Sequence, residues 1–338
     1  MWDTIEIEND SGDLVKSQSP IIVSASRSTD IPSFYSDWFI SRLKRGYSAW
    51  INPFNGIKYY VSYKNTRLIV FWSKDPKKMI KYLDYLDEMN INYYFQYTLN
   101  DYVREHFEPN VSSLESRIDT FIELSEKIGK SKVVWRFDPL ILTDTLGIDQ
   151  LLKKVQNIGD QLKNYVEKFV FSFADIKEYN NVQNNLRNSS IKYQEFNERL
   201  MIEFAKELQK LNSNWKYKIS TCAEKIALEE YGITHNKCID DDLIIKLFPQ
   251  DKILMDFLGV RILSPDIFNT EQRIGQRKNL KDKGQRKLCG CILSKDIGEY
   301  NTCPHLCEYC YANSSKKSAI SNWRQHIINP LSDTITGK

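Results

Sequence analysis

The sequence predicts an α/β protein built as a TIM-like (β/α) barrel with a C-terminal cysteine-rich segment. Short apolar runs alternate with helical patterns, which favours parallel strands joined by right-handed crossovers. About eight such units fit within roughly 250 residues, the size of a (β/α) barrel. Five of the seven cysteines lie between Cys289 and Cys310. An open doubly wound sheet is the alternative to the barrel.

The predicted strands are short apolar runs that end in polar residues, as expected of parallel strands buried on both faces. Helical spacing of apolar residues predicts helices over residues 34–43 and 112–128. In the second, Ser112 and Glu115 match a capping box, and Gly129 is placed to end the helix. The predicted strands cover residues 20–26, 48–52, 67–72, 93–99, 133–138, 169–173 and 217–222.

Changes in composition divide the chain into four parts. Residues 1–19 are polar and acidic, which predicts a tail, and regular structure is expected to begin at Pro20. Residues 20–265 are assigned to the barrel and residues 266–288 to a basic linker. Residues 289–338 form the C-terminal segment, which is expected to hold an iron–sulfur cluster.

Charge and hydropathy narrow the class of protein. The net charge is only +3, so no global positive field indicates nucleic acid or a membrane surface. No apolar run reaches the ~18 residues of a membrane span, and the acidic start lacks the features of a signal peptide. We therefore expect a cytoplasmic protein without a membrane partner. Neither GxGxxG nor GxxxxGK[ST] follows a predicted strand, which disfavours enzymes with those nucleotide-binding loops.

Polar residues gather where the predicted strands end. In barrels this end carries the catalytic rim, so these side chains are candidates for catalysis or cofactor binding. Asp30 and Asp138 each precede a proline closely and could instead be helix caps or turn residues. An arginine beside an apolar strand requires an anion or carboxylate partner. The catalytic candidates are Arg27, Asp30, Arg136, Asp138 and Glu224, and Gln96 is a candidate for cofactor binding.

A basic segment from Arg273 to Lys287 precedes the cysteine-rich part. Its simplest interpretation is a solvated loop. It could also contact phosphates. This gives a second hypothesis, in which the protein is a non-catalytic barrel that is stabilised by zinc or an iron–sulfur cluster and binds nucleic acid through this basic segment. The segment lacks the aromatic residues that interleave with cations in single-strand binders.

The cysteines form the most specific pattern in the chain. In a reducing cytosol, clustered cysteines favour metal binding or catalysis over disulfides. Cys303, Cys307 and Cys310 are separated by three and two residues, so one loop could bring three thiolates to an iron–sulfur cluster. Zinc is the rival, because similar spacings also form tetrahedral zinc sites.

The other four cysteines could form a second metal site or cluster. Alternatively, one of them could be the fourth ligand of the first cluster and close its open iron. Cys222 could also be an ordinary buried residue. The four are Cys222, Cys238, Cys289 and Cys291.

The motif Cys303-x3-Cys307-x2-Cys310, with Tyr309 before the third cysteine, resembles that of the radical S-adenosylmethionine superfamily. The resemblance implies a [4Fe–4S] cluster whose open iron binds S-adenosylmethionine, a reductant, and a 5′-deoxyadenosyl radical that acts on a small-molecule or macromolecular substrate. It places Tyr309 and His305 around the cluster.

The motif departs from that superfamily in its position. It ordinarily follows the first strand, whereas here only 28 residues follow Cys310. We expect a permuted order, in which the cluster loop follows the last strand and caps the same rim. The usual Gly-Gly-Glu segment is missing, so the polar residues at the strand ends would have to bind the amino group of the cofactor.

Over most of its length the chain also resembles an uncharacterised bacterial family, domain of unknown function 1848. That family's cysteine cluster is noted for its likeness to radical S-adenosylmethionine enzymes, but the family name implies no reaction. The segments that carry the resemblance are residues 24–32, 52–55, 71–74, 135–139, 221–224 and 238–240, together with the cysteine-rich tail.

Overall fold

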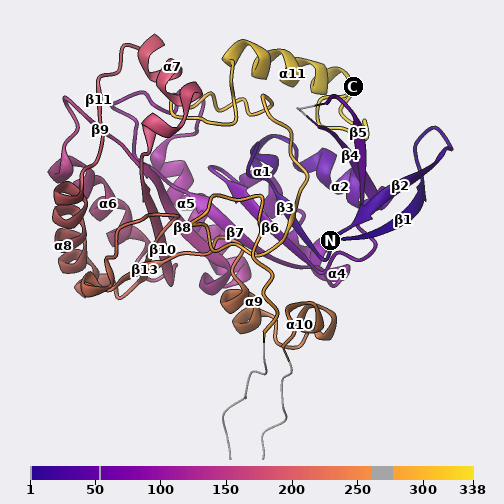
Figure 1. Cartoon of the computed structure of the whole chain (residues 1–338), viewed down its shortest axis with the longest axis horizontal. Coiled ribbons are helices and arrows are strands. Elements are labelled where there is room, and N and C mark those ends of the chain that lie inside the picture. Colours follow the sequence, from indigo (N-terminus) through magenta and orange to yellow (C-terminus); the bar gives the residue numbers. More distant parts are fainter. Residues whose placement is uncertain (1, 53–54, 261–276) are drawn as a thin grey trace, which may run out of the picture.

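The computed structural model describes residues 2–52, 55–260 and 277–338, which form a mixed α/β fold (Figure 1). Its centre is an eight-stranded parallel sheet. In order across the sheet, its strands are β13 (Ile233–His235), β12 (Lys218–Thr221), β10 (Lys168–Phe173), β8 (Val133–Leu140), β7 (Asn92–Thr98), β6 (Leu68–Ser73), β3 (Ile22–Ala25) and β14 (Lys295–Asp296).

The order of the strands is cyclic with respect to the chain. From β3 to β13 each strand lies beside the next one of this sheet in the sequence, and the last strand, β14, pairs in parallel with the first, β3. The predicted parallel α/β architecture is thus confirmed. A closed barrel would require β13 to pair with β14. Within the described residues no such pairing is found, and these two strands are the edges of the sheet.

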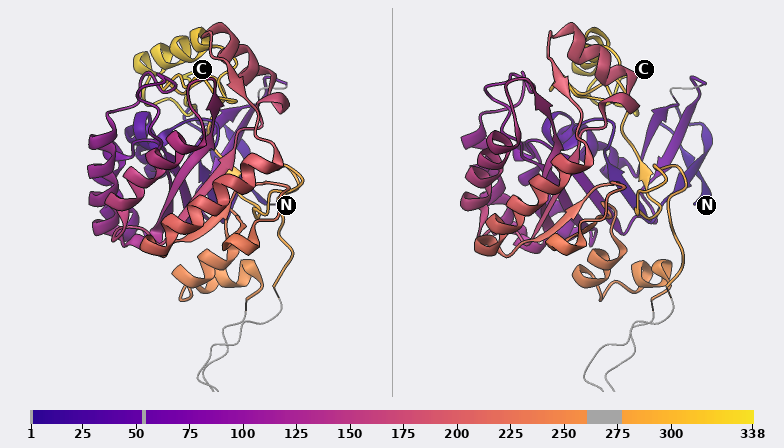
Figure 2. Two further views of the ribbon diagram at one scale, coloured as in Figure 1. Left: turned by 90° about the vertical axis from the view of Figure 1, so that its left-hand side faces the viewer. Right: turned by 60° about the vertical axis from the view of Figure 1, so that its left-hand side comes forward.

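Helices cover the sheet and extend beyond its ends. Short helices and longer amphipathic helices alternate with the strands, because parallel strands have to be joined by crossover connections. In Figure 2, α7 and α11 lie at one end of the molecule and α9 and α10 at the other. The helices are α1 (Ile31–Phe34), α2 (Ser36–Arg45), α3 (Lys77–Ile80), α4 (Leu83–Glu88), α5 (Leu114–Ile128), α6 (Ile148–Leu162), α7 (Asn180–Asn188), α8 (Glu198–Trp215), α9 (Asp241–Leu247), α10 (Lys252–Leu258) and α11 (Lys316–Ile328).

Alternation along the strands gives the sheet two buried faces. Ile69 and Phe71 of β6 point to the outer face, where they pack in one core with helices such as α2, α5 and α6. Leu68 and Val70 point to the opposite, inner face, where a second core contains α9 and α10. Tyr94 of β7 belongs to this inner core as well. Both faces are apolar, which explains the nearly continuous apolar runs of these strands.

The N-terminal residues differ from the prediction. Residues 1–19, expected to be a tail, contain β1 (Asp3–Glu8) and β2 (Leu14–Ser19), which pair antiparallel. Regular structure therefore begins before Pro20. An ion pair between Arg42 of α2 and Asp10, 2.6 Å long, ties this hairpin to the body of the protein.

The predicted strand over residues 48–52 also belongs elsewhere. It corresponds to β4 (Tyr47–Ile51), which pairs antiparallel with β5 (Lys58–Ser62) and not with the large sheet. Together with β1 and β2 these strands form a four-stranded sheet. The pattern of β4 could not show this, because the sequence of a strand does not identify its partner.

Helix α5 begins one residue later than the predicted cap. Ser113 is the N-cap, and its hydroxyl accepts a hydrogen bond from the Ser116 N–H at 3.3 Å. Ser112 donates instead to the carboxylate of Asp75, 2.5 Å away. The helix ends at Gly129, as predicted. A further small sheet pairs β9 (Leu142–Thr143) with β11 (Tyr193–Gln194). In the part of the chain that the structure describes, no helix has the length and apolarity needed to cross a membrane.

We predict that Gly159→Ala destabilises the fold. A Cβ at Gly159 of α6 would lie 2.5 Å from the indole ring of Trp215, the last residue of α8. Such overpacking costs about 1–3 kcal/mol. Urea denaturation followed by tryptophan fluorescence measures this loss of unfolding free energy. Gln156→Ala, on the exposed side of the same helix, is the control and should change it by less than about 0.5 kcal/mol. Equal stabilities of the two variants would contradict the prediction.

Candidate functional site

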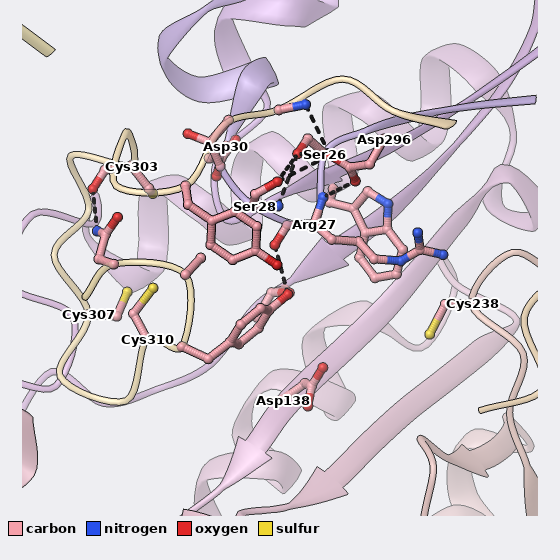
Figure 3. A pocket seen from close by; sticks show the side chains of 18 of the residues that line it. Ser26, Arg27, Ser28, Asp30, Asp138, Cys238, Asp296, Cys303, Cys307 and Cys310 are labelled. Atoms are coloured by element: carbon pink, nitrogen blue, oxygen red, sulfur yellow. Dashed lines mark hydrogen bonds between the residues drawn. The ribbon is translucent and has the colours of Figure 1, made fainter. Parts of the chain in front are cut away.

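A cavity of about 750 Å³ opens at the carboxyl ends of the parallel strands. It is lined by all seven cysteines, which come from two groups (Figure 3). We call Cys303, Cys307 and Cys310 the loop cysteines. The inner cysteines are Cys222, Cys238, Cys289 and Cys291. The cavity's volume is within the range of small-molecule sites.

The loop cysteines follow β14, the last strand of the sheet, as the sequence predicted for a permuted order. Their loop is fixed by hydrogen bonds from outside it: Tyr35 donates to the Thr302 carbonyl at 2.5 Å and Asn313 to the Cys303 carbonyl at 2.8 Å. Within the loop, the Cys310 N–H donates to the Cys307 carbonyl at 3.2 Å. Cys307 and Cys310 therefore lie on one turn, and Cys303 lies earlier in the same anchored loop.

Burial controls the ionisation of the loop cysteines. It raises the pKa of the Cys303, Cys307 and Cys310 thiols above their usual range. Unliganded, these thiols are therefore neutral at physiological pH. A metal ion binds cysteine as the thiolate, and its positive charge stabilises the thiolate against the cost of burial.

Asp30 is fully occupied with structural contacts. It is the N-cap of α1, and its Oδ1 accepts hydrogen bonds from the Ser33 N–H at 3.0 Å and the Ser73 hydroxyl at 2.7 Å. Its Oδ2 lies 2.7 Å from the Lys74 backbone nitrogen and 2.9 Å from Nε2 of His305. Asp30 lines the cavity, but its role as a helix cap, the alternative considered from the sequence, explains its position. Through His305 it also anchors the cysteine loop.

Tyr309 is held by a buried polar network. Its hydroxyl donates to the Glu108 carboxylate and accepts from Lys74 Nζ at 2.8 Å and from Asn100 Nδ2 at 2.9 Å. Burial opposes ionisation of Glu108, but the ammonium of Lys74 and the guanidinium of Arg117 outweigh it and lower the pKa of Glu108. The tyrosine is therefore fixed between two loop cysteines by charged groups.

Arg136 and Asp138 form a buried ion pair at the end of β8. Ser172 also donates to Asp138. Burial opposes ionisation of Asp138, but Arg136 outweighs it and lowers the pKa of this carboxyl. The second terminal nitrogen of Arg136 donates to Gln96 at 3.2 Å and to the sulfur of Cys238 at 3.1 Å. Arg136 thus connects the strand end to the inner cysteines.

Arg27 carries an unused hydrogen-bond donor. Its Nη2 is buried and has no hydrogen-bond partner, while Nη1 contacts only the Ser294 hydroxyl, at 3.4 Å. The guanidinium lies 5.3 Å from the ring centre of Trp72, and that of Arg136 lies 5.5 Å from the same ring. Burial lowers the pKa of Arg27, but neighbouring acidic groups, chiefly Cys291, raise it above its usual value. Arg27 is positioned to bind an anionic group in the cavity.

The sequence did not identify Asp296, the most densely bonded carboxylate of the cavity. It accepts from the hydroxyls of Ser24, Ser26 and Ser28 at 2.9, 2.7 and 3.2 Å. The backbone N–H groups of Arg27 and Gly298 donate to it at 2.8 and 3.0 Å. Nothing in the sequence indicated that β14, a strand of only two residues, would pack against these serines, because Asp296 lies 270 positions after Ser26.

Lys295, next to Asp296, was also missed. It lies in the wall of the cavity, with its ammonium 4.2 Å from the ring centre of Trp50. Burial lowers the pKa of Lys295 to about 8. This lysine can therefore exchange a proton near neutral pH.

Two of the predicted site residues are not among those that line the cavity. Gln96 donates to the Cys238 carbonyl at 2.8 Å, behind the wall. Glu224 accepts from the Phe173 N–H at 2.9 Å, and burial raises its pKa to about 8. Both were selected because they stand at strand ends, but both bond to backbone groups, and Gln96 bonds to Arg136 as well.

The basic segment is only partly described, because Arg273 to Gln276 lie outside the described residues. Of the described part, Arg277 pairs with Asp241 and Asp242 and Arg286 pairs with Asp175. Carboxylates of the same chain thus neutralise these two guanidinium groups. The observed pairs do not favour nucleic-acid binding.

Comparison with known proteins identifies the family. The family model described as Domain of unknown function (DUF1848) matches residues 22–312, and the chain therefore belongs to this family. No curated protein matches it. A solved structure of a putative alpha-L-fucosidase from Bacteroides thetaiotaomicron is similar, with 11% sequence identity and a TM-score of 0.24 over 56% of this chain and 81% of that chain. A TM-score this low carries no argument about fold or function.

We predict that Tyr309→Phe destabilises the protein more than Tyr311→Phe. The first removes a buried hydroxyl with three partners and leaves Lys74 and Asn100 short of an acceptor, which costs about 1–3 kcal/mol. Tyr311 is 46% exposed and donates to one carbonyl, that of Arg27, so its loss should cost less than about 1 kcal/mol. Urea denaturation of the metal-free protein compares them. The reverse order of stabilities would disprove the network's role.

Proposed function

We propose that this member of the DUF1848 family is an iron–sulfur enzyme that binds a [4Fe–4S] cluster on Cys303, Cys307 and Cys310 and uses S-adenosylmethionine. The observation that carries the proposal is that these three cysteines, on one short loop, line a cavity into which strand-end polar residues also project. Three cysteines would ligate three irons of such a cluster and leave the fourth iron without a protein ligand.

The surroundings of the loop cysteines fit this group. The sulfur donor set suits iron–sulfur clusters. His305, a further potential ligand in the loop, is engaged by Asp30 at 2.9 Å and by the Asn110 carbonyl at 3.2 Å, so it does not compete. When bound, a cluster with an open iron provides a site for S-adenosylmethionine and the electron for its reductive cleavage.

The chain's own residues would orient the ligands. Lys74 brings a cation to the loop: its ammonium lies 5.2 Å from the ring centre of Tyr309 and offsets negative charge on Cys307. Arg27 offers an unpartnered donor that fits a carboxylate. Asp138 and Lys295 supply a carboxylate and a titratable amine in the cavity wall. These groups would bind substrate and cofactor and exclude bulk water.

The proposed site also requires an enclosed sheet. We propose that the large sheet is a (β/α) barrel whose gap between β13 and β14 is filled by the segments that adjoin these strands. The Ile292 N–H donates to the Ile239 carbonyl at 3.1 Å, so the segments after β13 and before β14 are in contact. This contact supports a wall around the cavity at the position where strand pairing is interrupted.

Anaerobic reconstitution with iron and sulfide tests the function. We expect an electron paramagnetic resonance signal of the dithionite-reduced protein that changes when S-adenosylmethionine is added. We also expect 5′-deoxyadenosine and methionine as products, detected by mass spectrometry. Dithionite is the electron donor, and the hydrogen atom comes from substrate or solvent-derived donors.

The variant with Cys303→Ala, Cys307→Ala and Cys310→Ala should lose both the response to S-adenosylmethionine and the products. Protein incubated with iron but without sulfide is the control for adventitious iron. The proposal would be refuted by zinc on the loop cysteines, or by a cluster whose electron paramagnetic resonance signal does not change when S-adenosylmethionine is added.

A further inference from the structure

The inner cysteines come from three separate segments that meet on the inner face of the sheet. Cys222 follows β12, Cys238 follows β13, and Cys289 and Cys291 precede β14. All four belong to or pack against the core that includes Leu68 and Val70. They lie on a different part of the cavity wall from the loop cysteines, as the separation of Cys238 from Cys307 in Figure 3 shows.

The sulfur atoms of this group are in contact in pairs and accept hydrogen bonds. The sulfurs of Cys222 and Cys238 are 3.5 Å apart. Cys291 Sγ accepts from the N–H groups of Cys238 and Ile239 at 3.3 and 3.4 Å. Cys238 Sγ accepts from Arg136 at 3.1 Å and from the Asn236 amide at 3.2 Å.

Four donors directed at two sulfurs would stabilise thiolates at these positions. A neutral thiol is a weak acceptor, and a buried guanidinium gains little from pointing at one. Hydrogen bonds to ligand sulfurs are a standard means by which proteins tune iron–sulfur clusters. Metal-bound thiolates therefore require such hydrogen-bond donors, whereas cysteines in an apolar core do not.

Positive charge is concentrated at the same place. Arg136 is buried and contacts Cys238 directly, and Arg27 lies beside Cys291 and Cys238. Asp138 neutralises Arg136, but no carboxylate forms an ion pair with Arg27 in the described residues. Arg27 can therefore offset the excess negative charge of a metal centre with four thiolates.

We propose that Cys222, Cys238, Cys289 and Cys291 bind a second iron–sulfur cluster, ligated by all four. In a tetrahedral zinc site with Zn–S bonds of about 2.3 Å, the sulfurs lie about 3.8 Å from one another. Among the described residues no three cysteine sulfurs all lie within 4.8 Å of one another. The close pair of Cys222 and Cys238 does not suit a cubane, in which each thiolate binds a different iron. A [2Fe–2S] cluster, in which four thiolates bind two irons in pairs, fits one close pair within a wider set. The inference does not rest on the function proposed for the loop cysteines.

The experiment uses the full chain in which the loop cysteines are replaced by alanine. This variant leaves the inner cysteines and their core untouched, so it does not risk the fold around the proposed site. After anaerobic reconstitution we expect about two irons and two sulfides per chain, against about six of each in the unaltered protein. Iron, sulfide and zinc are measured together, and circular dichroism verifies folding.

A matched variant, with Cys222→Ser, Cys238→Ser, Cys289→Ser and Cys291→Ser, should keep about four irons, all on the loop cysteines. Because this variant alters a buried core, Mössbauer spectroscopy of the unaltered protein provides the second measurement and should resolve two clusters.

Three outcomes would overturn the proposal: zinc instead of iron in the loop-cysteine variant, no metal in it, or a disulfide between Cys222 and Cys238 in the reconstituted protein. Failure of the function proposed for the loop cysteines is separate. In that case the loop-cysteine variant would still bind about two irons and two sulfides, whether the loop cysteines of the unaltered protein hold zinc or a cluster that does not respond to S-adenosylmethionine.

Discussion

The carboxylate of Asp296 fastens the C-terminal segment to the first strand of the large sheet. It gathers three serine hydroxyls and two backbone N–H groups, from Ser24 to Ser28 on one side and Gly298 on the other. Asp296 is partly buried, and a carboxylate withdrawn from water needs such donors. This clamp directs the following residues across the cavity, so the positions of all three loop cysteines depend on it.

The clamp also explains why residue 298 is glycine. A Cβ there would lie 1.9 Å from the Ser26 hydroxyl and 2.6 Å from its Cβ. Any side chain would push the C-terminal segment away from β3 and break the bonds to Asp296. The glycine is therefore required by close approach and not by an unusual backbone conformation.

Local patterns predicted most strands of the large sheet because each is a short apolar run with polar residues at its end. They failed where structure depends on distant partners. The strand at residues 47–51 looks like a parallel strand but pairs with β5, and β14 has only two residues, too few for any pattern. The acidic hairpin at residues 3–19 was mistaken for a tail because both of its strands are largely polar.

In the candidate site too, the sequence predicted local features and missed contacts between distant segments. The cysteine spacing singled out the loop cysteines, since three cysteines within one short loop are a local feature. It could only list the inner cysteines, because their convergence requires three segments to meet. Arg27 and Arg136, selected at strand ends, both line the cavity, but only Arg136 has a carboxylate partner, Asp138, in the described residues. Gln96 and Glu224 were selected by the same rule of position, but Gln96 bonds to the Cys238 carbonyl and to Arg136, and Glu224 accepts from the Phe173 N–H.

The topology resolves the late position of the cysteine motif. In the superfamily that the motif resembles, the cysteines follow the first strand, whereas here they come near the end of the chain. Because β14 pairs in parallel with β3, the loop after β14 emerges beside the carboxyl end of the first strand of the sheet. The motif is thus displaced in sequence but adjacent in space to the usual location. A cluster at this position would face the same strand ends. The late position of the motif in the sequence therefore does not by itself argue against the proposed chemistry.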